Sequence, residues 1–466
     1  MSKDATKKIK GICLAICAGI GSLQLIYAIL WAFRNGCNVQ DFYDTSLYLE
    51  SAVTMLGDGW RLLGYSVLVR FFLGLQKWLG SYYVTVLYVV QAVISLLCFA
   101  QGCKTIGELI YHKKISYIKM LLPALYILTL PVIWQMQFAV LPDALCVAMV
   151  VLMFSKIAEC LWKYSDIQWP ATFVIFGCLL FISVLHRHYF YSSVLLCGIS
   201  VLVIIFKGAQ KKYRNRNAVV LVCSIILSMV LAFIVSGIVN KQNVRTDSYL
   251  RYSTEADLWS MFVYPNIRED YDDYPPCVKE VLSQETVAVY GDHYERYMNY
   301  IAIEIQNRAG MEAEQIYREM LKTGMRLHRE EVAEGLLKEG ISYLAFPFAM
   351  IKNMYYNGDS LYGHNFIRMY EADPGLTNDY MHIGMNGFGL IAVIGILNYF
   401  FAFMEKKEGR KNMVAAILYY VSGIIVIILP LMLFSVVKFD YRFGMVPAFV
   451  WGAFALVNVL CKTSEE

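Results

Sequence analysis

Two carboxylates stand close together after the first long apolar stretch of the chain. Asp41 and Asp44 are three residues apart and share one face if the segment is helical. A carboxylate held beside a reacting hydroxyl takes its proton as a general base. In the structural alternative, Asp41 caps a helix and Asp44 is an acid in its first turn, which the helix dipole favours. Apolar residues at helical spacing from Tyr48 predict a short amphipathic helix on the membrane surface, with Glu50 on another face.

Cations and imidazoles gather in two later turns. The run His186-Arg187-His188 forms one turn, and Lys438 and Arg442 precede the last apolar stretch. Guanidinium and ammonium groups bind and neutralise a departing phosphate, arginine by bidentate contacts. With the carboxylates, they predict transfer of a group away from a lipid-linked phosphate that reaches the site from the bilayer. Alternatively, the arginines extend to lipid headgroups and the histidines are satisfied interfacial residues.

A third polar turn carries Asp143 directly after Pro142. This pair is also an ordinary helix start, with proline placed to begin the helix. Ionisable residues next to a bilayer core are costly and tend to be functional. Asp143 therefore joins the candidate site.

The composition is that of a membrane-embedded chain. Of 466 residues, 58% are hydrophobic and only 17% are charged, and the net charge is +4. Several windows exceed the roughly 18 apolar residues needed to cross a bilayer. No basic domain indicates nucleic-acid binding. Most of the 12 cysteines lie inside apolar windows and are expected to be small buried hydrophobes rather than disulfide partners or zinc ligands.

The fold class expected is an all-α polytopic membrane protein of about ten spans, with juxtamembrane helices in the first outer loop and a small helical extracytoplasmic domain. The expected spans are 11–33, 81–101, 119–137, 143–161, 168–186, 190–206, 218–239, 387–404, 413–433 and 443–461. Lysine and arginine collect in the N-terminal tail and in three loops on the same side, which places both termini in the cytoplasm. The pattern fits a bacterial plasma membrane, and the endoplasmic reticulum is the alternative.

Three regions follow from these spans. Residues 1–239 form an N-terminal transmembrane module with a catalytic outer loop at 34–80, residues 240–386 an extracytoplasmic helical domain, and residues 387–466 the C-terminal transmembrane helices. The middle region contains an acidic turn. Its carboxylates either bind a divalent cation through oxygen ligands or form a solvent-exposed acidic turn. These residues are Asp270, Asp272 and Asp273.

Four short motifs resemble those of the C-type glycosyltransferase superfamily, the multi-span enzymes that use polyprenyl-phosphate-linked sugars. They are Asp44-Thr-Ser-Leu-Tyr48, Gly64-Tyr65-Ser66, Pro142-Asp143-Ala and Tyr441-Arg442-Phe-Gly-Met-Val-Pro447. The chain departs from the family where Thr45 replaces the second acid of a pair and Ser66 replaces proline. The resemblance covers 1–206 in layout and the last span by motif, and no motif of the middle region matches.

The resemblance implies sugar transfer to a glycan, lipid or protein acceptor, with inversion at the sugar carbon. It implies Asp44 as the base, with Asp41 second, and Asp143 and Glu50 as groups that orient the acceptor or a cation. It further implies a set of residues that bind the donor phosphate. These are His186, Arg187, His188, Lys438 and Arg442. A divalent cation is possible on this pattern, without a defined ligand set.

Two other functions remain open. A polymerase or ligase of lipid-linked polysaccharide also carries a large late outer loop, and residues 378–389 are faintly similar to that class. The early acidic loop argues against it. A flippase for a lipid-linked molecule would use the outward charges to line a path, although the span interiors hold almost no charged residues. A non-catalytic membrane scaffold is a third alternative.

Overall fold

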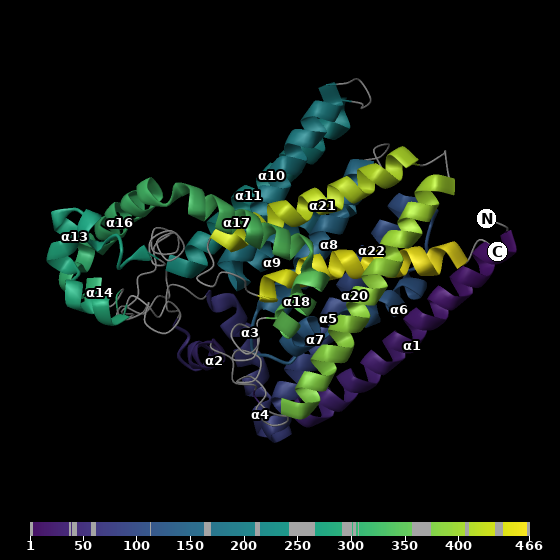
Figure 1. The fold of residues 1–466 in the computed structure, drawn as a ribbon, viewed down its shortest axis with the longest axis horizontal. Coiled ribbons are helices and arrows are strands. Elements are labelled where there is room, and N and C mark those ends of the chain that lie inside the picture. The colour runs from purple at the N-terminus through teal and green to yellow at the C-terminus, as the bar shows by residue number, and fades with distance from the viewer. Residues whose placement is uncertain are drawn as a thin grey trace.

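The computed structural model is helical throughout the part of the chain that it describes (Figure 1). The described residues are 3–36, 39, 44–56, 62–111, 113–162, 169–209, 215–241, 266–290, 301, 304–305, 307–356, 374–405, 410–433 and 441–463. Among them are six helices long and apolar enough to cross a membrane, or seven if one bent helix pair counts as a single span. Four apolar helices of 10–17 residues accompany them. The all-helical class and the membrane location are therefore confirmed.

Among the described residues, nine long helices form the bundle that we call the membrane body. They are α1 (Lys3–Asn35), α5 (Tyr83–Tyr111), α8 (Asp143–Trp162), α9 (Trp169–Leu185), α10 (Arg187–Ala209), α11 (Asn215–Lys241), α20 (Pro374–Glu405), α21 (Arg410–Leu433) and α22 (Met445–Thr463). Each expected span except 119–137 overlaps one of them, but α20 begins 13 residues before the expected span 387–404 and α5 ends 10 residues after the expected span 81–101. α5 lies at the centre, in contact with α8, α21 and α22. α1 and α20 run side by side along one flank (Figure 1).

The expected span 119–137 is not one straight helix. It consists of α6 (Tyr117–Leu128) and α7 (Pro131–Gln137), which meet at 91°. Pro131 begins α7 because a proline cannot continue the preceding helix. At the break, main-chain carbonyls lose their hydrogen-bond partners within the helix, and side chains of helices remote in the sequence replace those partners. The Gln24 amide donates to the Tyr126 carbonyl at 2.9 Å and to Thr129 Oγ1 at 3.0 Å, and the Tyr380 hydroxyl donates to the Thr129 carbonyl.

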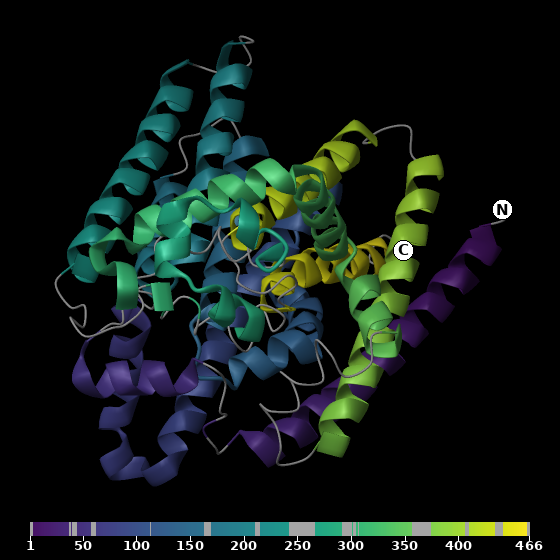
Figure 2. The same cartoon turned by 60° about the vertical axis from the view of Figure 1, so that its left-hand side comes forward.

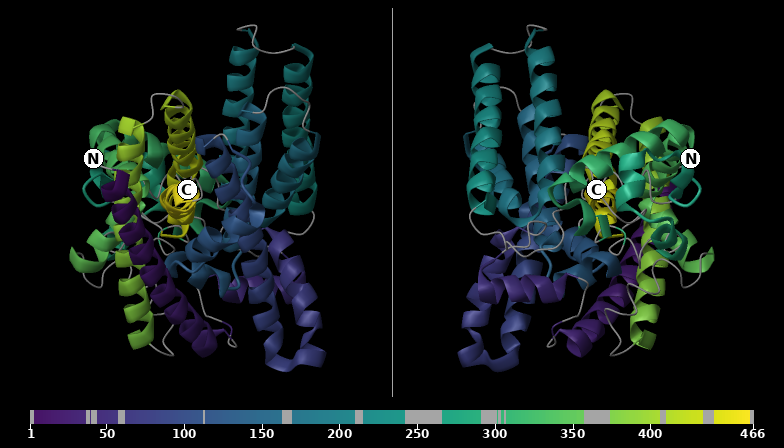
Figure 3. Two further views of the ribbon diagram at one scale, coloured as in Figure 1. Left: turned by 90° about the vertical axis from the view of Figure 1, so that its right-hand side faces the viewer. Right: turned by 90° about the vertical axis from the view of Figure 1, so that its left-hand side faces the viewer.

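The first loop folds as short helices at one end of the bundle. They are α2 (Thr45–Thr54), α3 (Leu63–Gly74), α4 (Gln76–Leu79) and the 3₁₀ turn η1 (Gly80–Tyr82). The pair α10–α11 projects at the opposite end (Figure 3). α2 is the expected amphipathic helix, beginning at Thr45, with Tyr48 and Ala52 buried and Glu50 exposed. Arg70 of α3 fixes the last turn of α2, because its Nη1 donates hydrogen bonds to the main-chain carbonyls of Ala52 and Val53 at 3.0 and 2.9 Å.

The region 240–386 contributes to two different cores. Its first described part comprises η3 (Tyr271–Asp273), α13 (Pro276–Val281), α14 (Gln284–Tyr290), η4 (Gly310–Glu312) and α16 (Ala313–Leu327). These elements enclose a separate apolar cluster that includes Tyr274, Val278 and Met320, and they project from the bundle (Figures 1 and 2). α17 (Arg329–Leu344) and α18 (Phe346–Tyr356) instead pack into the membrane body. We call residues 266–327 the small unit.

Candidate functional site

The central pair of the site joins the first loop to the turn before the last helix. Asp44 Oδ2 lies 3.7 Å from Nη1 of Arg442, which belongs to the 3₁₀ turn η6 (Tyr441–Gly444). Asp44 precedes α2 but makes no capping hydrogen bond to it, so its carboxylate faces the guanidinium instead of the helix amides. The two side chains keep 25% and 20% of their surface exposed. Solvent or a ligand therefore has access to both charges.

The turn between α9 and α10 joins the same site. The Tyr189 hydroxyl donates to the Arg442 carbonyl at 3.4 Å, which ties this turn to η6. The His186 ring contacts the rings of Tyr189 and His188, with centroids 5.0 and 5.4 Å apart. His188 is buried, and the charges of Arg187 and Arg442 act on it. The expected cationic turn and Arg442 thus lie together.

Arg187 is oriented by its own helix. Its Nε donates to the Tyr191 hydroxyl at 3.1 Å, and its guanidinium carbon lies 5.7 Å from the centroid of that ring. Stacking on an aromatic ring and a hydrogen bond to its hydroxyl fix a guanidinium without neutralising it. The Arg187 guanidinium is therefore held in place at this end of α10, where it can bind an anion.

A glycine brings the first loop against the cationic turn. A Cβ at Gly64 of α3 would lie 2.8 Å from the carbonyl carbon of Val184 and 2.9 Å from its Cβ. Val184 is two residues before His186, so this close approach sets the distance between the loop and the turn. The rings of Tyr48 and Tyr65, 5.2 Å apart and edge to face, then connect α2 to α3. Of the quoted Gly64-Tyr65-Ser66 motif, the glycine and the tyrosine thus have visible packing roles.

Asp143 lies near a buried polar network that is centred on Tyr65 and Gln91. It is 1% exposed at the start of α8 and lies near Tyr65. The Tyr65 hydroxyl donates to Gln91 Oε1 at 2.7 Å, and the Gln91 amide donates to the carbonyl of Gln137 at 2.9 Å. The network links the first loop, α5 and α7. Asp143 therefore lies next to the loop that carries Asp44, but inside the protein.

The remaining predicted site residues differ in their placement. Glu50 is exposed on α2 and takes no part in the Asp44–Arg442 ion pair. Asp41 and Lys438 lie outside the described residues.

In the acidic turn of the small unit, the three carboxylates that were expected to act together point in different directions. Asp270 is buried, with Oδ1 at 2.6 Å from Nε2 of His328, whereas its two neighbours are exposed. Within the described ranges, no three His, Cys, Asp or Glu side chains converge as metal ligands would.

A buried carboxylate at the other end of α8 was missed by the sequence analysis. Glu159 Oε1 accepts hydrogen bonds from Gln101 Nε2 at 2.8 Å and Thr105 Oγ1 at 2.9 Å, and Lys156 Nζ lies 2.9 Å from its Oε2. At 1.5 Å per residue, it lies about 24 Å along the helix from Asp143. The signal was present in the sequence, since Lys156 and Glu159 stand at i, i+3 within an apolar window. The expectation that span interiors hold almost no charge was therefore incomplete.

We expect Glu159→Gln to lower the free energy of unfolding by about 2–3 kcal/mol, because Lys156 would be left partly buried without its charged partner. Thermal unfolding of the purified protein in detergent measures this loss. Glu334→Gln is the matched control, since Glu334 pairs with Lys338 at the surface, where solvent screens the two charges and their pairing adds little to stability. Equal unfolding temperatures for the two variants would contradict a structural role for Glu159.

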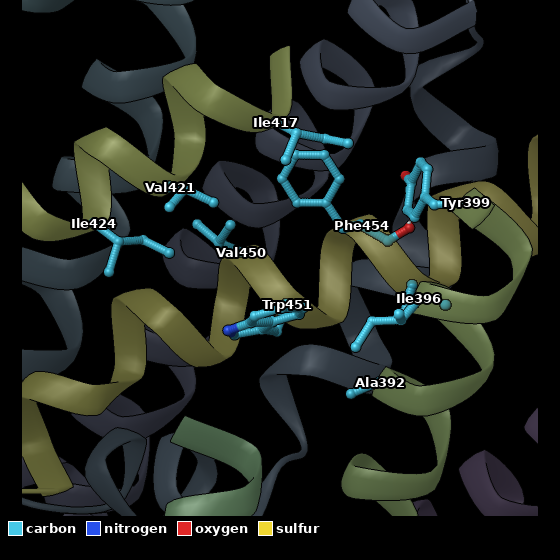
Figure 4. A pocket seen from close by; sticks show the side chains of 11 residues that line it. Ala392, Ile396, Tyr399, Ile417, Val421, Ile424, Val450, Trp451 and Phe454 are labelled. Atoms are coloured by element: carbon cyan, nitrogen blue, oxygen red, sulfur yellow. Dashed lines mark hydrogen bonds between the residues drawn. The ribbon is translucent and has the colours of Figure 1, made fainter. Parts of the chain in front are cut away.

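An apolar groove of about 210 Å³ lies between α20, α21 and α22 (Figure 4). Two of its lining residues carry polar groups, and both hydrogen-bond to main chain: Trp451 Nε1 donates to the Leu344 carbonyl at 2.6 Å, and the Tyr399 hydroxyl to the Phe454 carbonyl at 2.9 Å. The surface that remains is hydrocarbon. Trp451 lies six residues, about 9 Å, into α22, whose first residue Met445 directly follows η6.

These features define the class of the protein: an all-helical integral membrane protein with an acid–arginine pair at one end of its bundle. Comparison with protein-family models, with curated proteins and with solved structures gives no match.

Proposed function

We propose that this protein is a membrane glycosyltransferase that moves a sugar from a polyprenyl-phosphate-linked donor to an acceptor on the extracytoplasmic side. The observation that supports it is the ion pair of Asp44 with Arg442, whose side chains are partly exposed at one end of the bundle. In sugar transfer from a phosphate, a carboxylate removes the proton of the acceptor hydroxyl while a guanidinium stabilises the departing phosphate, and this pair supplies both groups. The resemblance to C-type glycosyltransferases, drawn from the motifs around these same residues, points to the same reaction.

In this reaction the acceptor hydroxyl oxygen attacks the anomeric carbon from the side opposite the phosphate. The carbon–oxygen bond to the phosphate breaks, and its electron pair leaves with polyprenyl phosphate. Asp44 takes the hydroxyl proton, and Arg442 neutralises the charge that develops on the departing phosphate. One displacement of this kind inverts the sugar carbon. Asp41 is the second choice for the base.

The neighbouring groups have supporting roles in the proposal. His186, Arg187, His188 and Lys438 complete the binding site for the donor phosphate. Asp143 and Glu50 orient the acceptor or a divalent cation. The finer topology belongs to the proposal as well: α9, α11, α22 and the bent pair α6–α7 complete ten spans, both termini are cytoplasmic, and the membrane is a bacterial plasma membrane.

The apolar groove suits the hydrocarbon tail of the donor. We expect Val421→Trp, which adds bulk to a lining residue, to raise the apparent KM for a long polyprenyl donor at least tenfold. The tryptophan should displace about two methylene groups of the donor tail from the groove. Each buried methylene contributes about 0.8 kcal/mol to binding, and about 1.4 kcal/mol corresponds to a tenfold change in affinity. Steady-state transfer kinetics with long and short donors measure the change, and a two-isoprene donor should be unaffected. Val414→Trp, on α21 but not among the lining residues, is the control. An equal increase in KM for the long and the short donor would show that the groove is not the binding site of the donor tail.

The decisive experiment is reconstitution. Purified protein in liposomes is supplied with synthetic polyprenyl-phosphate sugars and with glycan, lipid and peptide acceptors, and products are identified by mass and anomeric configuration. Addition of one inverted sugar supports the proposal. Products of increasing length would instead identify a polysaccharide polymerase or ligase of lipid-linked glycans.

A flippase for lipid-linked glycans is the second candidate, and the bent pair α6–α7 favours it. Discontinuous helices with polar partners at the break are a feature of transporter binding sites. Movement of a labelled lipid-linked sugar across proteoliposomes, without any sugar transfer, would select this candidate.

A further inference from the structure

The helices α17 and α18 present two different apolar faces. Tyr343, Phe346 and Met350 are fully buried in the core of the membrane body. On the other side, Leu337 and Ile341 are 64% and 55% exposed. Their i, i+4 spacing places these two side chains on one face of α17. The outward face of α17 therefore exposes two large apolar side chains next to each other.

The end of α17 is held inside the membrane body. Its Leu344 carbonyl accepts a hydrogen bond from the Trp451 indole at 2.6 Å. Trp451 is six residues after the start of α22, about 9 Å along that helix. Phe346, at the start of α18, occupies the space next to Gly444, two residues after Arg442. The α17–α18 turn therefore lies beside η6 and alongside a membrane helix.

The neighbours of this exposed face are candidate membrane spans. α17 packs on α21, and α18 packs on α20. Ile425 and Leu429 of α21 are themselves 47% and 44% exposed, as residues facing lipid are. Phe348 of α18 adds a further exposed ring. We call Leu337, Ile341 and Phe348 the stripe; these exposed apolar side chains belong to helices that pack directly on the candidate spans α20 and α21.

Polarity changes along α17 toward the bundle. Glu330, Leu337 and Ile341 lie at i, i+7 and i+11 and so share one face of the helix. Glu330, two turns closer to the small unit, is exposed and charged. The pair Glu334–Lys338, 2.7 Å apart and exposed, lies beside the stripe, and the hydrogen bond from Lys338 lowers the pKa of Glu334. A helix that enters the headgroup layer obliquely has this gradient from charge to hydrocarbon.

We propose that Leu337, Ile341 and Phe348 are embedded in the membrane leaflet at the Asp44 end of the bundle, so that α17 is an interfacial helix seating the small unit on the lipid surface. The inference is independent of the proposed sugar transfer. It gives α17 and α18 a physical role, since α17 connects the small unit to the bundle and Phe346 of α18 lies against Gly444 of η6.

The test is photo-crosslinking of the full chain in phosphatidylcholine liposomes. Benzoylphenylalanine is placed at position 337, 341 or 348 and, as the matched control, at position 330 on the same face. After irradiation, we expect lipid adducts at the three apolar positions at least tenfold above those at position 330, measured by intact-protein mass. Size-exclusion chromatography before irradiation selects folded protein.

Three results would overturn the proposal. The first is folded protein without lipid adducts at positions 337 and 341. The second is a yield of lipid adducts at position 330 equal to that at positions 337 and 341, because this face of α17 would then not pass from water into lipid. The third is covalent dimers as the main product, which would assign the stripe to a second copy of the chain. Positions 337 and 341 are largely exposed, so a bulky residue there does not disturb the core.

Discussion

Replacement of Asp44 by asparagine is expected to lower the rate of sugar transfer about 10²- to 10⁴-fold, the usual contribution of a general base. Asparagine has nearly the same shape as aspartate and is equally suited to the position before a helix, so α2 should remain folded. The amide cannot accept the hydroxyl proton. Single-turnover transfer from a polyprenyl-phosphate donor measures the loss, with Glu285→Gln, an exposed acid of α14, as the control.

A second variant distinguishes two roles of Asp44: a general base in the reaction, or only a partner in a structural ion pair with Arg442. In the charge exchange Asp44→Arg with Arg442→Asp, opposite charges still face each other. A role limited to holding η6 near α2 predicts restored transfer, whereas a base at position 44 predicts none. Normal transfer by folded Asp44→Asn protein would remove Asp44 from the chemistry.

The Gly64→Ala substitution is expected to cost about 1–3 kcal/mol of stability, as overpacking of a tight contact does. The new Cβ would meet the backbone of Val184, and a backbone segment inside a helix cannot rotate away as a side chain does. Moving α3 to relieve the clash would separate Asp44 from the cationic turn, so transfer should fall as well. Chemical or thermal unfolding in detergent measures the stability.

Gly74→Ala is the matched control on the same helix. Nothing lies within 4 Å of a Cβ at Gly74, and alanine favours a helix over glycine by up to about 1 kcal/mol. This variant should therefore be as stable as the parent or more so. If both variants unfolded alike, the α3–α9 contact would not be the element that positions the first loop.

The acidic turn illustrates what spacing alone left undecided. Asp270, Asp272 and Asp273 are adjacent in sequence and equally suited to bind a cation. In the folded unit, burial of Tyr271 and Tyr274 rotates the turn so that Asp270 points inward to His328 while the other two carboxylates face outward. The orientation depends on side chains packed from α13 and α16, and no local pattern contains that information.

The sequence by itself determined the helices of the membrane body and their approximate limits. Helix formation and partition into a bilayer are local, because each helix satisfies its own backbone hydrogen bonds and its apolar length suffices. The tertiary structure decided the bend at Leu128–Pro131, the burial of Glu159 and the meeting of Asp44 with Arg442. These depend on contacts between helices remote in the chain, such as Gly64 against Val184, whose energies arise only when the helices pack together.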